Sequence, residues 1–352
     1  MTGAGRVPVD PEGRRFLDGF RARHPAGVVR EALAALRPLR VLVIGEAIVD
    51  EYRYCVALGK ANKDAMISTR HVRVERHAGG ALACANHVAG FCGAVDLVTG
   101  LGDDGQEAFV RGRLATGVHP RFVVRAGSPT ITKRRYVSEP SLAKLFEVVT
   151  MDDTPLPTAL EEDLLAHLDA ALSGYDVVIA TDYGHGFLGP RTVELLAARA
   201  RYLAVNTQAN PGNLGFHVVT RYPRADYVCL DEGEARLATR DRWSPAAELA
   251  RALRASLRSS ALSLTRAQHG VLVAGADGTV WEVPALARAV VDRMGAGDAF
   301  LAVSAPCAAA GLPLDVVALL GSAAGAVAVG IVGNRSAVEP GAVERLLGEL
   351  LA

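Results

Sequence analysis

The stretch VVDRMGAGDAF, residues 290–300, leads directly into a long run of small apolar residues that is typical of a buried helix. Gly295, Ala296 and Gly297 would stand at the start of that helix, where unpaired backbone N–H groups and the helix dipole attract an anion. Asp298 would repel a phosphate that was merely bound there. Its carboxylate is useful if it takes a proton from an incoming hydroxyl. The stretch therefore predicts phosphoryl transfer with Asp298 as base, and the alternative is that Asp298 only caps the helix.

Short β-rich runs alternate with helical patterns from residue 40 onward. The runs are RVLVIG (40–45), VDLVTG (95–100), DVVIATD (176–182), YLAVNT (202–207), DYVCLD (226–231) and LSLT (262–265). They are apolar on both alternating faces, as in a parallel sheet covered by helices on both sides. Residues 156–172, 190–201 and 244–258 between them have helix signatures. The pattern predicts an α/β fold with its ligands at the carboxyl edge of the sheet.

Two regions, residues 52–75 and 121–149, interrupt this alternation with strand-like sequences. They contain every lysine of the chain: Lys60, Lys63, Lys133 and Lys144. We expect a small β-strand lid over the sheet edge, and a homodimer through the lid, because exposed strand edges are commonly protected by pairing with another copy. Residues 1–38 are predicted to form a helical extension that docks on the core, and residues 39–352 a single catalytic domain.

Composition and charge limit the classes of partner. The 352 residues carry 38 Lys and Arg against 38 Asp and Glu, so the protein lacks the charge of a general nucleic-acid or membrane-surface binder. The uncharged residues 316–333 have the length of a membrane helix, but their Ala, Gly and Ser content favours a buried helix. Five scattered cysteines argue against a disulfide framework or a structural zinc site. We expect a small-molecule partner and, without an apolar export segment at the N-terminus, a cytoplasmic location.

The turn GLGDDG at residues 100–105 matches the glycine pattern of dinucleotide-binding loops. Asp103 and Asp104 would place negative charge where a pyrophosphate needs donors. About 20 residues further on, where such loops have an acidic ribose ligand, the chain has Arg125. We therefore expect a tight turn whose Asp side chains cap the next helix, and no nicotinamide site.

The stretch at 290–300 resembles the D-x-x-G-A-G-D signature of the PfkB (ribokinase-like) carbohydrate kinases. Other landmarks follow in family order: VLVIGEAIVD (41–50), HAGGALACANHVAGFCGA (77–94), GLGDDG, DEGE (231–234) and LTRAQHG (264–270). Within the family, PTITKRRYVS (129–138) and TDYGHG (181–186) are most similar to bacterial heptose-7-phosphate kinases. Residues 41–55 and 79–92 further resemble the kinase part of proteins that fuse a nucleotidyltransferase to a PfkB kinase.

This resemblance implies a ribokinase-like three-layer α/β/α sandwich with a mainly parallel sheet, and a kinase that uses ATP and Mg²⁺. It implies that Asp298 is the base and that Gly295, Ala296 and Gly297 form the anion hole. The implied acceptor-binding residues are Asp50, Gly79, Gly80, Asn86, Lys133, Arg135, Asp182 and His185. The residues implied on the nucleotide side are Asp231, Glu234, Thr265, Gly270 and Ser322. Asp231 and Glu234 would hold the hydrated metal, since Mg²⁺ prefers oxygen ligands and keeps waters.

The chain departs from the family pattern on the acceptor side. Cys84 stands where family members usually have Asn, and Asn86 is the nearest Asn. Heptose kinases have Lys at the position of His185 and Asp-Pro-Lys at residues 206–208, which are Asn-Thr-Gln here. Two interpretations follow: the sugar differs from heptose 7-phosphate, or Lys133, Arg134 and Arg135 of the lid supply the charge that these lysines would have provided.

The lid segment TKRRYVS offers that charge. In an alternating strand, Lys133 and Arg135 share one face and Arg134 points to the other, although all three could equally be solvated surface residues. The favoured function is an ATP-dependent sugar kinase, with a sugar phosphate of the heptose 7-phosphate type as acceptor. The alternatives are a catalytically silent ATP- or sugar-binding regulator of the same fold, against which Asp298 argues, and a simple sugar or nucleoside kinase.

Overall fold

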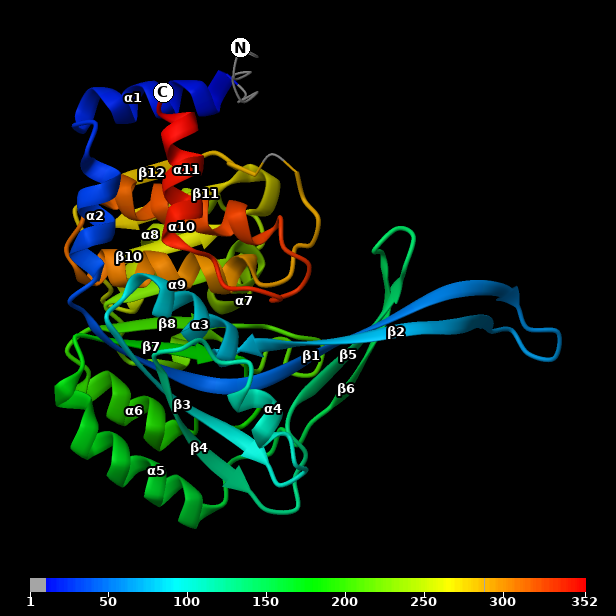
Figure 1. Ribbon diagram of the computed structural model, residues 1–352. Coiled ribbons are helices and arrows are strands. Elements are labelled where there is room, and N and C mark those ends of the chain that lie inside the picture. The colour runs from blue at the N-terminus through cyan, green and yellow to red at the C-terminus, as the bar shows by residue number, and fades with distance from the viewer. Residues whose placement is uncertain (1–10, 288) are drawn as a thin grey trace.

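The central sheet is mainly parallel, as predicted. The computed structural model describes residues 11–287 and 289–352, and its main sheet runs β12-β11-β10-β9-β8-β7-β1-β3-β4 (Figure 1). Neighbours from β10 to β4 are parallel, and β11 and β12 are antiparallel additions at one edge. The strands are β1 Arg40–Lys60, β2 Ile67–Gly80, β3 Ala94–Gly102, β4 Val118–Arg125, β5 Thr132–Ser138, β6 Lys144–Thr150, β7 Val177–Asp182, β8 Leu203–Thr207, β9 Tyr227–Asp231, β10 Ala261–Thr265, β11 Val271–Gly275 and β12 Val280–Val283.

Helices cover both faces of this sheet and make the three layers. The alternation of β1 shows why, because Val41 and Val43 enter one apolar core while Leu42 and Ile44 enter the other. The helices on the first face are α1 Pro11–Arg23, α2 Val28–Leu36, α3 Ala81–Phe91, α4 Glu107–Arg111, α9 Ala296–Ala309, α10 Leu314–Ala328 and α11 Pro340–Leu350. Those on the second face are α5 Thr158–Ala171, α6 Pro190–Arg199, α7 Glu232–Thr239 and α8 Ala246–Ser256.

The two small-residue helices α9 and α10 pack together on the first face, where their apolar surfaces meet the core rather than lipid. Of the helices in the described part of the chain, none is both long and apolar enough to cross a membrane. The expectation for residues 316–333 is confirmed as far as Ala328, where α10 ends.

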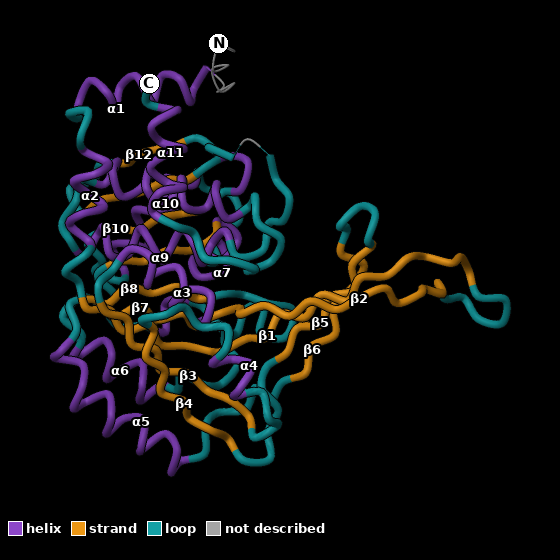
Figure 2. The backbone as a smooth tube through the Cα atoms, viewed as in Figure 1, coloured by secondary structure: helices purple, strands orange, loops and turns teal. Residues whose placement is uncertain are grey.

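The lid grows out of β1 itself. Residues 40–46 of β1 pair with β3 in the main sheet, whereas its continuation from Ala47 to Lys60 pairs with β2 and, in part, with β5. The lid strands therefore lie in the order β2-β1-β5-β6 and project from the body of the protein (Figure 2).

The predicted lid boundaries need correction. Lid pairing begins at residue 47 and ends at Gly80, beyond the expected 52–75, and residues 121–125 belong to β4 in the main sheet. The pattern at 121–125 was misleading because β4 is an edge strand of the main sheet, and exposed residues such as Arg121 give it the polar character expected of a lid strand. Residues 132–138 and 144–150 are lid strands, as expected.

The N-terminal helices dock on the core, as expected for the described part of residues 1–38. Leu17 and Phe20 of α1 and Leu36 of α2 are buried in the first core. His24 also contacts the start of α10, where its Nε2 lies 2.8 Å from Asp315 Oδ2. The extension therefore braces the helix that carries Ser322.

Candidate functional site

Two cavities meet at the N-terminus of α9. The first, here called the lid cavity, lies under the lid and is lined by Asp50, Lys133, Arg135, Tyr183, Asp298 and Asn334, among others. The second, the helix cavity, lies beside α9 and α10 and is lined by Asp231, Thr265, Gly270, Phe300 and Ser322, among others. Arg293 and Gly297 line both cavities. A group carried in one cavity can thus reach a group carried in the other at the start of α9.

Asp298 lies at this junction, in the first turn of α9. The Tyr183 hydroxyl donates a hydrogen bond to Asp298 Oδ1 across 2.6 Å. Burial raises the pKa of Asp298 to about 6, against the lowering effect of the Tyr183 hydrogen bond. The residue that caps α9 is Gly295, so helix capping does not account for the Asp298 side chain. A carboxylate with a pKa near neutrality is suited to accept a proton at physiological pH.

The backbone that precedes Asp298 has the form of an anion hole. Gly295 has a φ of +80°, and a Cβ there would lie 2.0 Å from Asn334 Oδ1, so a side chain would not fit. The backbone bonds of the helix begin with the Ala299 N–H, which donates to Gly295 O across 2.9 Å. The N–H groups of Ala296 and Gly297 therefore precede the helical ladder and are available to an anion.

The lid contributes two cations to its cavity. Arg135 is buried and forms ion pairs with Asp50 and, at 2.8 Å, with Glu147. Lys133 is only 8% exposed, and its side-chain ammonium makes no hydrogen bond or ion pair with any described residue. Burial lowers the pKa of Lys133, while Asp50 and Glu147 act against that change. Lys133 is thus a buried cation whose ammonium N–H groups can donate to a ligand.

The predicted alternation along β5 is correct. Arg134 points away from the lid cavity, where its guanidinium bonds to Thr150 Oγ1 and lies 3.3 Å from Glu51 Oε1. Lys133 and Arg135 on the other face line the cavity. The interpretation of Lys133 and Arg135 as solvated surface residues is therefore wrong, because both are buried.

The Gly-Gly pair supports Asp50 on the other wall of the lid cavity. A Cβ on Gly79 would lie 2.3 Å from Asp50 Oδ2, and Gly80 has a φ of +58° at the start of α3. Only glycine lets the backbone of β2 pass this close to the carboxylate. Asp50 accepts a hydrogen bond from Arg135 through Oδ1.

Asn86 does not join the site. Its side-chain amide donates to Arg113 O (2.9 Å) and accepts from the Ala115 N–H (2.7 Å), so it fastens the loop after α4. Two residues along a helix correspond to a rotation of about 200°, which puts Asn86 on the side opposite Cys84. Cys84 is the residue near the base, since the charge of Asp298 is one cause of its raised thiol pKa. The prediction that Asn86 binds the acceptor, in place of the Asn that family members have at the position of Cys84, is therefore wrong.

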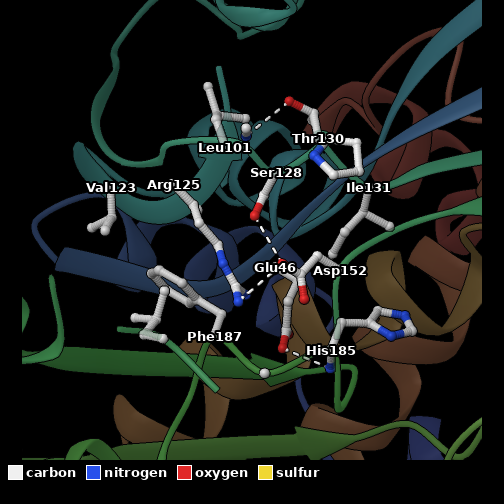
Figure 3. Close-up of a pocket in the computed structure, with 15 residues that line it drawn as sticks. Glu46, Leu101, Val123, Arg125, Ser128, Thr130, Ile131, Asp152, His185 and Phe187 are labelled. Atoms are coloured by element: carbon white, nitrogen blue, oxygen red, sulfur yellow. Dashed lines mark hydrogen bonds and ion pairs between the residues drawn. The ribbon is translucent and has the colours of Figure 1, made fainter. Parts of the chain in front are cut away.

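Asp182 and His185 also lie outside the lid cavity. Asp182 is buried, and it accepts hydrogen bonds from Arg221 (2.7 Å) and from the Tyr222 hydroxyl (2.9 Å). His185 borders a third cavity together with Glu46 and Asp152 (Figure 3). The expectation that Asp182 binds substrate is corrected, because its carboxylate is occupied by Arg221 and Tyr222. The role of His185 stays a prediction, since its buried Nε2 has no hydrogen-bond partner among the described residues.

The polar groups of this third cavity are largely paired with one another. Arg125 lies 3.0 Å from Asp152, the Ser128 hydroxyl donates to Asp152 across 2.8 Å, and Glu46 accepts from the His185 N–H at 3.1 Å (Figure 3). Burial raises the pKa of Glu46 to about 7. This cluster joins the turn at 181–186 to the loops that precede β5 and α5.

The turn at residues 100–105 is another part of this support. Asp103 accepts from the Gly127 N–H at 3.0 Å, and Asp104 accepts from the Thr130 N–H (3.0 Å) and hydroxyl (2.8 Å). The expectation that they cap α4 is wrong, since its cap is Gln106 without a side-chain hydrogen bond. Both carboxylates instead hold the loop that leads into β5 and Lys133.

Most of the residues predicted to bind the nucleotide line the helix cavity. Its volume is about 380 Å³, against about 180 Å³ for the lid cavity, and apolar walls from Leu286, Val290 and Val329 suit a nucleobase. Ser322 Oγ is buried and has no partner among the described residues, as expected of a group that awaits a ligand. Thr265 and Gly270 line the same cavity.

Asp231 and Glu234 form a capping box at the start of α7. Glu234 N–H donates to Asp231 Oδ1 (2.9 Å), while Glu234 accepts from the N–H groups of Asp231 (2.9 Å) and Ala209 (3.1 Å). Burial raises the pKa of Glu234 to about 7. Residues 11–287 and 289–352 contain no group of three or more His, Cys, Asp or Glu side chains that could hold a metal. A divalent metal at this point would therefore be held mainly by waters and phosphate oxygens, with the two carboxylates as hydrogen-bond acceptors for those waters.

Four polar residues of the lid cavity were not predicted as site residues from the sequence. They are Tyr183, Gln208, Arg293 and Asn334. Tyr183 and Gln208 follow β7 and β8 at the carboxyl edge of the sheet, a position that could have marked both. Asn334 had no local signal, because a loop far along the chain brings it against Gly295.

Comparison with known proteins is consistent with this geometry. A family described as pfkB family carbohydrate kinase matches residues 39–340. The curated relatives include the Bifunctional protein HldE of Shewanella amazonensis and of Shewanella baltica, each 29% identical over 311 residues that cover 87% of this chain and 63% of the relative. The chain therefore spans less than two thirds of the length of these relatives.

Solved structures share the fold. A putative ribokinase from Agrobacterium tumefaciens has a TM-score of 0.69 at 17% identity, over 89% of this chain and 99% of that one. Phosphofructokinase-2 from Escherichia coli, in complex with substrates and products, has a TM-score of 0.73 at 14% identity, over 89% of this chain and 100% of that one.

Proposed function

The chain belongs to the pfkB family of carbohydrate kinases, and we propose that it transfers the γ-phosphate of ATP to a hydroxyl of a phosphorylated sugar. The observation that carries the proposal is the position of Asp298, at the junction of a small charged cavity under the lid and a larger, mostly apolar cavity beside α9. A sugar kinase needs this junction, because the two substrates must meet at one base and one anion hole.

Asp298 acts as the general base in this proposal. Its Oδ2 receives the proton of the sugar hydroxyl as the hydroxyl oxygen forms a bond to the γ-phosphorus, and the bond from that phosphorus to ADP breaks. The N–H groups of Ala296 and Gly297 bind the charge on the transferred phosphoryl group. Arg293 lines both cavities, and its charge favours the same anion. A catalytically silent regulator would have no use for a base at this point.

The buried cation Lys133 supports an acceptor that already carries a phosphate. Arg135 forms ion pairs with Asp50 and Glu147, whereas no described carboxylate lies within ion-pair distance of the Lys133 ammonium. A phosphate placed beside Lys133 would gain charge-assisted hydrogen bonds that a neutral sugar cannot make. A sugar phosphate of the heptose 7-phosphate type is therefore favoured over a simple sugar or nucleoside.

Mg²⁺ would accompany ATP at the mouth of the helix cavity. Asp231 and Glu234 would hold its waters, and the ion would neutralise part of the triphosphate charge. Removal of divalent metal by a chelator should abolish turnover, and Mg²⁺ should restore it.

The lid supports a homodimer in the same proposal. Its strands expose large apolar side chains in a part of the protein that has no second layer; these are Leu58, Ile67, Val72, Val74 and Phe146. A second copy would cover them and protect the strand edges. We further propose that the protein has no nucleic-acid or membrane-surface partner, on the grounds of its zero net charge, and that it is cytoplasmic.

The proposal is tested by measuring ADP release on a panel of free sugars, nucleosides and sugar phosphates. We expect turnover with a sugar phosphate, heptose 7-phosphate among them, and weak turnover with the matching free sugars. Preferred turnover of a free sugar or a nucleoside would move the assignment to a simple kinase. Binding of ATP without turnover on any acceptor would favour the regulator.

A further inference from the structure

We propose that Tyr183 is a positioning residue for the base, and that its hydroxyl holds Asp298 with one carboxylate oxygen turned toward the acceptor. This inference rests on the proposed function, since it requires Asp298 to be the base. It concerns a residue that no glycine motif or charge pattern of the chain singles out.

The contact between Tyr183 and Asp298 is short and shielded. The Tyr183 Oη to Asp298 Oδ1 distance is 2.6 Å, and Tyr183 is 3% exposed. Both residues line the lid cavity. A carboxylate that keeps Oδ1 on a fixed donor cannot rotate freely about its last bond. Oδ2 is then the oxygen left for the sugar hydroxyl.

The backbone of Tyr183 is held from both sides. Its N–H donates to Glu46 Oε2 across 3.0 Å, and its carbonyl accepts from the side-chain amides of Asn210 (3.1 Å) and Asn213 (3.0 Å). Glu46 also accepts from the His185 N–H, so that one buried carboxylate spans the turn (Figure 3). A ring that only filled space would not need its peptide fastened at both ends, whereas a donor aimed at a base does.

Several groups face Asp298 from the surrounding elements. Asp50 of β1 and Glu234 of α7 are acidic, Lys133 of β5 is basic, and Cys84 of α3 and Cys229 of β9 are buried thiols. Of these described groups and Tyr183, only Tyr183 donates a hydrogen bond to the carboxylate. That bond stabilises the ionised form and lowers the pKa that burial raises. The phenol itself stays protonated, since burial raises its own pKa well above the ordinary value.

Tyr183→Phe tests this role, with Tyr222→Phe as the matched control. Tyr222 is a buried tyrosine whose hydroxyl donates to Asp182, so its replacement makes the same chemical change away from the base. We expect Tyr183→Phe to move the acidic limb of the kcat/KM profile to higher pH by about one unit or more. We also expect a kcat at least about tenfold lower, because the base loses its orientation, and an unchanged KM for ATP. Tyr222→Phe should leave the limb in place.

A second variant keeps the test valid if Tyr183→Phe does not fold. Replacement of Tyr183 by 3-fluorotyrosine preserves the ring and makes the hydroxyl a stronger donor, so the acidic limb should move to lower pH. Thermal melting and ATP binding establish that each variant is folded. Limbs that stay in place for both folded Tyr183 variants, or that move equally in Tyr222→Phe, would overturn the inference.

Asp298→Asn separates the inference from the function on which it rests. If Asp298→Asn keeps its turnover, the proposed base is wrong and Tyr183 has nothing to position. If Asp298→Asn loses turnover and the Tyr183 limbs do not move, the base stands and the role of Tyr183 falls.

Discussion

The replacement Lys133→Met tests the charge of the acceptor. Methionine keeps most of the length and apolar volume of the lysine stem, and it removes the ammonium group. Lys133 is 8% exposed, so little water or salt can screen its contact with a phosphate. A charge-assisted hydrogen bond at such a site contributes about 1.5–3 kcal/mol. Its loss should raise KM for the sugar phosphate by about 10- to 150-fold, with KM for ATP nearly unchanged.

The control for this experiment is the neighbouring residue of the same strand. Arg134→Met removes a charge one position along β5, but its guanidinium bonds to Thr150 Oγ1 on the other face. The assay is ADP release at saturating ATP, with a sugar phosphate and the matching free sugar each varied. We expect only Lys133→Met to raise KM for the sugar phosphate, and neither variant to raise KM for the free sugar. An equal rise in KM for both acceptors, or an unchanged KM for the sugar phosphate, would refute the phosphate site.

Three further predictions concern the base, the wall of the lid cavity and the lid. Because burial raises the pKa of Asp298 to about 6 and the base works only as a carboxylate, kcat/KM should be flat above that pH and fall about tenfold per unit below it; a limb near the pKa of an ordinary Asp would contradict this. Gly79→Ala puts a Cβ 2.3 Å from Asp50 Oδ2 and should raise KM for the acceptor about tenfold or more without changing KM for ATP, so unaltered acceptor kinetics would argue against Asp50 as a sugar ligand. Ile67→Glu combined with Val74→Glu should convert a lid-mediated dimer into monomers in sedimentation velocity, and a wild-type monomer at micromolar concentration would exclude that dimer.

The order of strands and helices was predictable because its signals are local. The runs at 40–45 and 176–182 are apolar on both faces, which only a buried sheet tolerates, and glycines mark the start of α9. The length of β1 was not predictable in this way. Its pattern continues from the buried sheet into the lid without a break, and it is the change of partner after Glu46 that separates the two.

The candidate site was predictable where backbone geometry decides the role. The chain path requires glycine at Gly295 and Gly79. The glycine motifs at these positions helped to predict Asp298 and Asp50 as site residues. The direction in which a side chain points was harder to predict from the sequence. Asp182 and Tyr183 are neighbours at the end of β7, yet one turns into a buried network with Arg221 and the other reaches the base. Such a choice depends on loops distant in sequence, which a local pattern does not contain.

Asp298→Asn is the measurement that tests the central claim most directly. The amide fills the volume of the carboxylate but cannot accept the proton of the hydroxyl. We predict that this variant melts and binds ATP like the wild type, while kcat for the preferred sugar phosphate falls by about 10² to 10⁴. A kcat equal to that of the wild type would contradict the account, because phosphoryl transfer would then proceed without the base at the start of α9.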